Sequence, residues 1–154
     1  MRKLSVVIPA LNEEQAIEWV VKAIPVNELN EMGFEVQILV VDNGSEDKTA
    51  ELARKAGAEV VVEPKRGYGR AYKTGFSNAR GEIIATADAD LTYPVEDIPR
   101  LIAILEEENL DFLSTNRFAK MHRGAISLRN RFGNSVLNAT TRLCLLYTSP
   151  SPRD

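Results

Sequence analysis

The sequence predicts an α/β fold in which helices cover both faces of a doubly wound, mostly parallel sheet. Two observations carry this prediction. Short apolar runs rich in β-branched residues alternate five times with stretches of helical periodicity, without an internal repeat. Polar and charged residues follow directly after these runs, at the positions where parallel strands end and where such sheets bind their ligands.

Five strands are expected, at residues 4–8, 35–41, 59–62, 83–87 and 112–115. Pro9 is expected to end the first of them. Asn12 is predicted to cap the helix that follows the first strand, and Ser45 the helix that follows the second strand. These two helices are expected to end at Pro25 and at Gly57. Three further helices are expected, at residues 66–80, 94–108 and 126–143.

Composition favours one ordinary globular domain, since 44% of the 154 residues are hydrophobic and 27% are charged. No window approaches the roughly 18 consecutive apolar residues that span a bilayer, and the first residues lead directly into a strand-like run. We therefore expect a cytoplasmic protein.

The second part of the chain is basic. Residues 112–143 contain no acid and six bases, namely Arg117, Lys120, Arg123, Arg129, Arg131 and Arg142. This segment predicts an anionic partner, with a solvated basic helix face as the alternative. Nucleic acid is not expected, because the bases are not interleaved with stacking aromatic residues.

The last eleven residues, 144–154, match the translation of a common transposon-library sequencing adapter. We expect them to be a sequencing-adapter or cloning scar, with a native Pro-Ser linker as the alternative. The predicted domain is therefore 1–143, truncated at its C-terminus. Because the only cysteine, Cys144, falls in this tail, no disulfide or thiol chemistry is expected.

Asp88 and Asp90 follow the fourth apolar run at alternate positions, so both carboxylates are expected to converge on one site. Two like charges so close favour a bound cation. Hard oxygen ligands select Mg²⁺ or Mn²⁺, which bridges the phosphates of a nucleoside diphosphate. The alternative is one helix-capping and one solvated aspartate.

Other polar residues at strand ends are less specific. Asp42 could accept hydrogen bonds from a base or ribose, or belong to an ordinary turn. The negative charge of Glu13 could simply interact favourably with the positive, N-terminal end of the first helix. In residues 65–70 the glycines permit close approach of backbone to a ligand, and the cations could meet phosphate or be solvated.

Several familiar sites can be excluded. No glycine follows the first strand, as a dinucleotide-binding fingerprint requires, and Tyr72 stands where a P-loop needs glycine. His122 is the only histidine, so neither a Ser-His-Asp arrangement nor a histidine metal site is proposed.

Four motifs occur in one order: Val6–Glu14, Val40–Asp47, Gly67–Ala71 and Ala87–Pro94. Together they resemble the family 2 glycosyltransferases of GT-A fold, and most closely the branch of dolichyl-phosphate mannosyltransferases and polyprenyl-phosphate glycosyltransferases. The resemblance covers nearly all of residues 4–143. Four ordered matches are far more specific than any one of them.

The resemblance implies roles for individual residues. The nucleoside pocket would be lined by Pro9, Leu11, Glu13, Val41 and Asp42. The nucleotide would contact Asp88 and Ala89, the divalent metal would be held by Asp90, and Arg117 would face the phosphates. Asp88, Asp90 and Arg117 would thus carry the reaction.

This chain departs from the family pattern at two positions. Asn43 stands where many relatives have a second aspartate, and Thr92 stands where mannosyl enzymes often have a metal-binding glutamine. Both departures leave the nucleobase and the sugar open.

The implied reaction is an inverting transfer of a mannose- or glucose-type sugar from a GDP- or UDP-sugar to a polyprenyl or dolichyl phosphate. A phosphate monoester, with a second pKa of about 6, can attack without a base. The basic segment would bind the acceptor phosphate and contact the cytoplasmic face of the membrane. A sugar-1-phosphate nucleotidyltransferase and a nucleotide-sugar-binding fragment without turnover are the alternatives.

Overall fold

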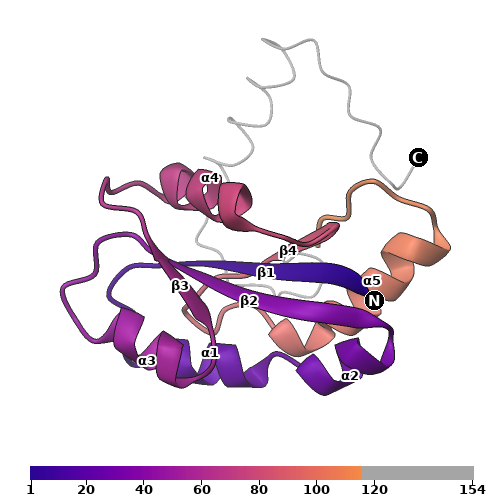
Figure 1. The fold of residues 1–154 in the computed structure, drawn as a ribbon, viewed down its shortest axis with the longest axis horizontal. Coiled ribbons are helices and arrows are strands. Elements are labelled where there is room, and N and C mark those ends of the chain that lie inside the picture. Colours follow the sequence, from indigo (N-terminus) through magenta and orange to yellow (C-terminus); the bar gives the residue numbers. More distant parts are fainter. Residues whose placement is uncertain (116–154) are drawn as a thin grey trace, which may run out of the picture. The chain divides into compact units, whose positions relative to one another are not determined.

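The computed structural model describes residues 1–115, and Met1–Leu113 form one compact unit. This unit is a parallel sheet with helices on both faces (Figure 1). Its elements, in chain order, are β1 (Arg2–Ala10), α1 (Ile17–Ala23), α2 (Val26–Glu31), β2 (Phe34–Asp42), α3 (Thr49–Lys55), β3 (Glu59–Val62), α4 (Tyr68–Asn78), β4 (Ile83–Thr86), a 3₁₀ helix η1 (Val95–Asp97) and α5 (Ile98–Glu107).

The strand order is β3-β2-β1-β4, and every pair is parallel. The chain thus builds outward from β1 to β3 and then crosses to the other side of β1. In Figure 1, α1, α2 and α3 lie below the sheet and α4 lies above it. This is the doubly wound arrangement predicted from the sequence, and it places a switch point between β1 and β4.

Alternating side chains of β1 build two cores. Leu4, Val6 and Ile8 are buried in a cluster with residues of α1, α2, α3 and α5. Val7 points to the opposite face and packs with Leu39, Val41 and Ala71 of α4. Because both faces of β1 are covered, its sequence is a nearly continuous apolar run, as expected of a central parallel strand.

Helix α4 approaches the sheet closely through Gly75. A Cβ atom at this position would lie 2.4 Å from Cγ1 of Val7 and 3.1 Å from Cγ2 of Val41. We expect Gly75→Ala to lower the free energy of unfolding by about 1–3 kcal/mol, because overpacking outweighs the helix propensity gained. Chemical denaturation measures the change.

Gly69→Ala is the matched control on the same helix. A Cβ atom at Gly69 meets nothing within 4 Å, so the substitution should be neutral or stabilise the protein by up to about 1 kcal/mol. If both variants were equally stable, the close approach of α4 to the sheet would be wrong.

The prediction that Pro9 ends the first strand is wrong, because β1 continues to Ala10 and Pro9 pairs in register with Val41. The carbonyl of Val7 accepts a hydrogen bond from the Ala87 amide, so odd-numbered residues of β1 direct their backbone groups towards β4. The register with β4 stops at Thr86. The missing N–H of Pro9 therefore costs no hydrogen bond, because the ladder between β1 and β4 has ended before it reaches Pro9.

Both predicted helix caps are also wrong. The first helix begins at Ile17 rather than after Asn12, and α3 begins at Thr49 rather than after Ser45. Both polar side chains instead bond to the neighbouring loop, as described below. A short helix, α2, was not predicted and follows directly after Pro25.

The later helices are confirmed with shifted ends, since α4 covers residues 68–78 and the helix predicted at 94–108 opens as the 3₁₀ turn η1 before α5. The strand predicted at 112–115 is wrong: these residues are irregular, and Phe112 is 80% exposed. An apolar run forms a strand only with a hydrogen-bonding partner, and no described strand pairs with it. The helix predicted at 126–143 lies outside the described residues.

No helix within residues 1–115 is long and apolar enough to cross a membrane.

Candidate functional site

Three loops leave the sheet at the carboxyl ends of β1, β2 and β4. Ala10 is paired with Asp42, and Val7 is paired with Thr86, so the ends of these strands are neighbours. The loops that follow therefore lie around the switch point of the sheet. Most of the site residues predicted from the sequence are on these loops.

The loops after β1 and β2 are joined by direct hydrogen bonds. The Asn12 amide donates to Ser45 Oγ at 3.0 Å, and Asn12 Oδ1 accepts from the Glu46 amide at 2.9 Å. The Glu13 amide donates to Thr49 Oγ1 at 2.8 Å. Asn12 has a φ of 57°, a left-handed conformation that asparagine tolerates better than most residues. Asn12 is thus a bridge between loops and not a helix cap.

Asp42 ends β2 with its side chain almost fully buried, at 6% exposure. Its Oδ1 accepts a hydrogen bond from the Ser45 amide at 3.1 Å, which forms a turn closed by an aspartate side chain. Of the other predicted pocket residues, Pro9 and Val41 are buried and paired with each other, whereas Leu11 is 39% exposed. The structure therefore brings the ends of β1 and β2 together as the sequence predicts.

Asn43 organises the loop before α4. This role of Asn43 was not predicted from the sequence. Its side-chain amide donates to the carbonyls of Glu63 at 3.0 Å and Lys65 at 2.9 Å, and its Oδ1 accepts from the Gly67 amide at 2.7 Å. Asn43 is only 4% exposed. An aspartate could not donate the first two bonds.

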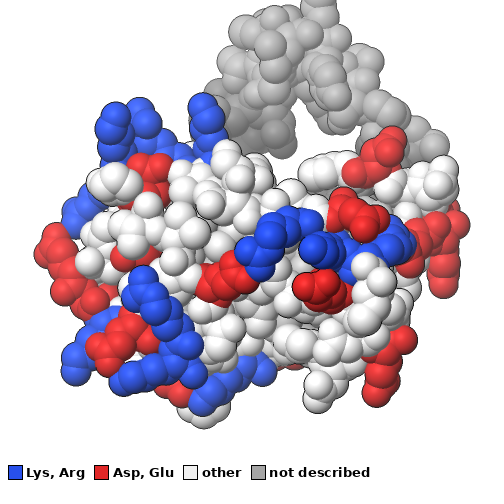
Figure 2. Space-filling view, in the orientation of Figure 1, with Lys and Arg blue, Asp and Glu red and all other residues white. Residues whose placement is uncertain are grey.

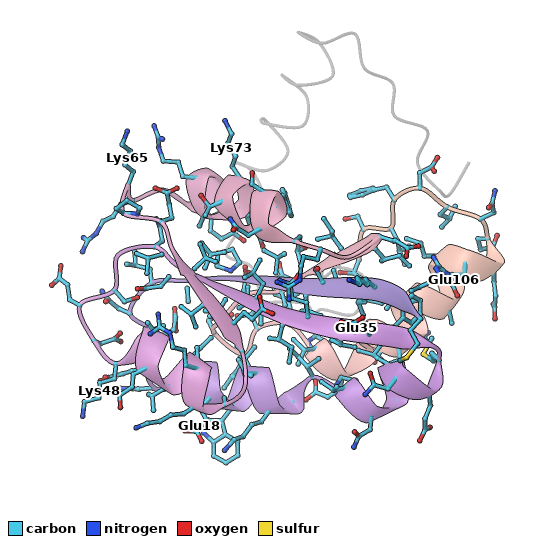
Figure 3. All side chains as sticks on the ribbon, viewed as in Figure 1. Glu18, Glu35, Lys48, Lys65, Lys73 and Glu106 are labelled. Carbon is cyan, nitrogen blue, oxygen red and sulfur yellow. The ribbon has the colours of Figure 1, made fainter. Side chains whose placement is uncertain are left out.

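The cations of this loop and of α4 are exposed. Arg66 pairs with Glu46 at 2.6 Å and so binds the β2 loop. In Figure 3, Lys65 and Lys73 extend into solvent, and Figure 2 shows Lys and Arg side chains gathered over α4 and the loop before it. Arg66 therefore has a structural partner, and the exposed lysines fit the solvated alternative.

Asp88 and Asp90 follow β4. Ala87 and Ala89 are buried in the core, so the two aspartates alternate with them and face away from it. Asp88 is half-buried, and its Oδ1 accepts a hydrogen bond from the Tyr68 hydroxyl at 2.7 Å. Asp90 is exposed, and its Oδ1 accepts from the Thr92 amide at 3.0 Å.

Electrostatics connects the loops after β1 and β4. Partial burial raises the pKa of Glu13, and the charges of Asp90 and Asp47 raise it further. Hydrogen bonding from Thr92 lowers the pKa of Asp90, which therefore stays ionised at neutral pH. The carboxyl edge of the sheet is thus a region of negative charge.

The chemistry of these donors fits a hard divalent cation. Within residues 1–115, no group of three or more His, Cys, Asp and Glu side chains is close enough to hold a metal by itself. Magnesium-type sites commonly use one or two carboxylates and take their remaining ligands from phosphates and water. Asp88 and Asp90 match such a shared site.

Tyr68 and Tyr72 were also missed as site residues, because their sequence signal was only that of a glycine-containing loop. Partial burial raises the pKa of both phenols, and the hydrogen bonds that Tyr68 makes with Tyr72 and Asp88 raise the pKa of Tyr68 further. Both phenols therefore remain protonated, and Tyr68 acts as a donor. Arg117, predicted to face the phosphates, lies outside the described residues, as does His122.

A doubly wound parallel sheet with carboxylates gathered at its switch point is typical of α/β domains that bind nucleotides. Comparison with known families narrows this class. The family described as "Glycosyl transferase family 2" matches residues 5–149. The chain therefore belongs to glycosyl transferase family 2.

The names of two relatives state what those proteins transfer or make. An undecaprenyl-phosphate 4-deoxy-4-formamido-L-arabinose transferase of Enterobacter sp. is 36% identical over 149 residues, covering 92% of this chain and 45% of that protein. A low-salt glycan biosynthesis hexosyltransferase of Haloferax volcanii is 40% identical over 118 residues, covering 74% and 27%. This chain thus spans less than half the length of these curated relatives.

Solved structures show the same fold. Glucosyl-3-phosphoglycerate synthase of Mycobacterium tuberculosis superposes with a TM-score of 0.58 at 34% identity, covering 68% of this chain and 40% of that one. The same enzyme in complex with Mn²⁺, UDP-glucose and phosphoglyceric acid gives a TM-score of 0.58 at 32% identity, covering 68% and 39%.

Proposed function

We propose that this protein transfers a mannose- or glucose-type sugar from a nucleoside diphosphate sugar to an acceptor, with inversion at the anomeric carbon. One observation carries the proposal: carboxylates from the ends of β1, β2 and β4 gather at one edge of the sheet. Their position at the switch point is where doubly wound sheets bind nucleotides.

In this proposal the nucleoside lies over the ends of β1 and β2. Asp42 accepts a hydrogen bond from the base or ribose, and its own turn to Ser45 holds it in place. Pro9, Leu11, Glu13 and Val41 complete the pocket. UDP is the first nucleotide to test, because the solved complex of a related enzyme contains UDP-glucose; GDP is the second.

Asp88 and the backbone of Ala89, whose side chain is buried in the core, contact the nucleotide, and Asp90 holds Mg²⁺ or Mn²⁺. When bound, such a cation neutralises the charge of the departing diphosphate. The chain's own contribution is to hold an ionised carboxylate at Asp90 and to orient Asp88. Related solved complexes contain Mn²⁺ or Mg²⁺ with UDP, which supports this assignment.

The proposed acceptor is a polyprenyl phosphate. Its phosphate, with a second pKa of about 6, is largely ionised at neutral pH and can displace the diphosphate in line without a general base. Relatives named for undecaprenyl phosphate support this choice. Arg117 and the basic segment would bind the phosphate and contact the cytoplasmic membrane face.

Calorimetry with UDP and GDP, each with and without Mn²⁺, tests the binding part of the proposal. We expect one nucleotide to bind, with an affinity that rises when Mn²⁺ is added. Glu35→Gln removes a charge from the opposite, amino end of β2, where Glu35 is exposed (Figure 3), and should leave binding unchanged. Binding of neither nucleotide would contradict the proposal.

Transfer assays test the acceptor. Radiolabelled UDP-glucose and GDP-mannose are incubated with polyprenyl phosphate or with phosphoglyceric acid, the acid found in the related solved complex. Labelled lipid is the expected product. Labelled phosphoglycerate would replace the lipid acceptor by a small phosphorylated acid, and binding without any product would favour a nucleotide-sugar-binding protein.

A further inference from the structure

Tyr68 connects helix α4 to the end of β4. It is the first residue of α4, and its hydroxyl donates to Asp88 Oδ1 at 2.7 Å, across 20 positions of sequence. The side chain as a whole is 62% exposed. Tyr68 is therefore an exposed tyrosine whose hydroxyl is nevertheless held by a carboxylate at ordinary hydrogen-bond length.

The ring of Tyr68 is fixed from its own helix. It packs edge-on against Tyr72, with ring centroids 4.9 Å apart and an interplanar angle of 87°. Tyr72 in turn packs on Phe76 at 5.5 Å. These residues recur every fourth position, so they form one aromatic row along α4. The row restricts the rotamers of Tyr68 and directs its hydroxyl towards Asp88.

The start of α4 is fixed from the sheet. Asn43, buried at the end of β2, accepts a hydrogen bond from the Gly67 amide directly before Tyr68. Further along the helix, Gly75 lies against Val7 and Val41. The backbone that carries Tyr68 is therefore anchored at two places to the same sheet that carries Asp88.

We infer that Tyr68 is a positioning residue that holds the Asp88 carboxylate in the orientation required for nucleotide binding. A hydrogen bond to an ionised carboxylate is stronger than a neutral one, and a carboxylate has a second oxygen for the ligand. Holding the side chain before the ligand arrives removes an ordering cost from binding. This inference rests on the proposed function, specifically on the contact of Asp88 with the nucleotide.

Tyr68→Phe tests the inference because it keeps the aromatic row and removes only the hydroxyl. Binding of UDP in Mn²⁺ is measured by calorimetry, and unfolding is measured without ligand. We expect the affinity to fall about tenfold or more, as the loss of one hydrogen bond to a charged group predicts. The unfolding midpoint should stay unchanged, because Tyr68 is mostly exposed.

Tyr72→Phe is the matched control. It removes the hydroxyl that lies 3.3 Å from that of Tyr68 but keeps the bond from Tyr68 to Asp88, so the affinity should change less than twofold. An equal loss in both variants would assign the effect to the contact between the two hydroxyls rather than to the bond from Tyr68 to Asp88, and would overturn the inference.

A double-mutant cycle with Asp88→Ala separates the inference from the proposed function. Once Asp88 is removed, Tyr68→Phe should cost nothing further. If Asp88→Ala weakens binding but Tyr68→Phe does not, or if both losses add, the inference fails and the proposed function stands. If Asp88→Ala leaves the affinity for UDP unchanged, the assigned role of Asp88 fails, and the inference fails with it.

Discussion

Asp90→Asn is expected to lower the affinity for UDP in Mn²⁺ by on the order of 100-fold, equivalent to about 2.7 kcal/mol. Asparagine has the shape of aspartate and keeps an oxygen for the Thr92 amide, so the local turn should survive. Only the charge that a divalent cation requires is lost. Titration calorimetry with and without Mn²⁺ measures the change, and the variant should bind UDP alike in both conditions.

The effect of the same substitution on folding should be small. Removing the charge of Asp90 relieves the repulsion that raises the pKa of Glu13, but it also removes an ionised carboxylate whose pKa is lowered by hydrogen bonding from Thr92 and which therefore stabilises the folded chain at neutral pH. Thermal unfolding of both proteins without ligand checks that the two effects nearly cancel. A variant that retained metal-dependent binding would exclude Asp90 as the metal ligand.

Asn43→Asp is expected to lower the free energy of unfolding by about 3 kcal/mol. The carboxylate would lie at a position that is only 4% exposed, facing the carbonyls of Glu63 and Lys65 without a hydrogen to donate. Two acceptors would lose their donor, and a negative charge would be buried beside them. Urea denaturation at neutral pH measures the loss.

The pH dependence of this loss can be worked out. Burial raises the pKa of the introduced carboxyl above its value in the unfolded chain. The penalty is therefore smallest at low pH, where both states are protonated, grows as pH rises from the unfolded-state pKa to the folded-state pKa, and is constant above it. Asn30→Asp, at an exposed position in α2, is the control and should change stability by about 0.5 kcal/mol or less. Equal losses in the two variants would contradict the role of Asn43.

The strands were predicted well because a strand that is buried on both faces appears in the sequence as a continuous apolar run. The runs at 35–41, 59–62 and 83–87 differ from the observed strands by at most one residue at either end. The run at 112–115 failed because apolar character alone does not supply a pairing partner. Whether a segment forms a strand depends on a neighbouring strand to pair with as well as on the segment's own residues.

The candidate site was predicted in part. Asp42, Asp88 and Asp90 were predicted from their positions after buried runs, which is a local property, and the structure places them at or just after the ends of β2 and β4. Asn12 and Ser45 were misassigned as caps, since nothing local distinguishes a polar side chain that caps its own helix from one that bonds the next loop. Tyr68 was missed because its partner lies 20 residues away.

The sequence by itself determined the alternation of strands and helices, the two-sided burial of the central strand and the order of the motifs that carry the family. These properties follow from hydrophobic periodicity and turn chemistry, which act over a few residues. Only the tertiary structure decided which polar groups meet: Asn12 with Ser45, Asn43 with the loop before α4, and Tyr68 with Asp88. Such contacts depend on which strand ends become neighbours, and the strand order β3-β2-β1-β4 decides that.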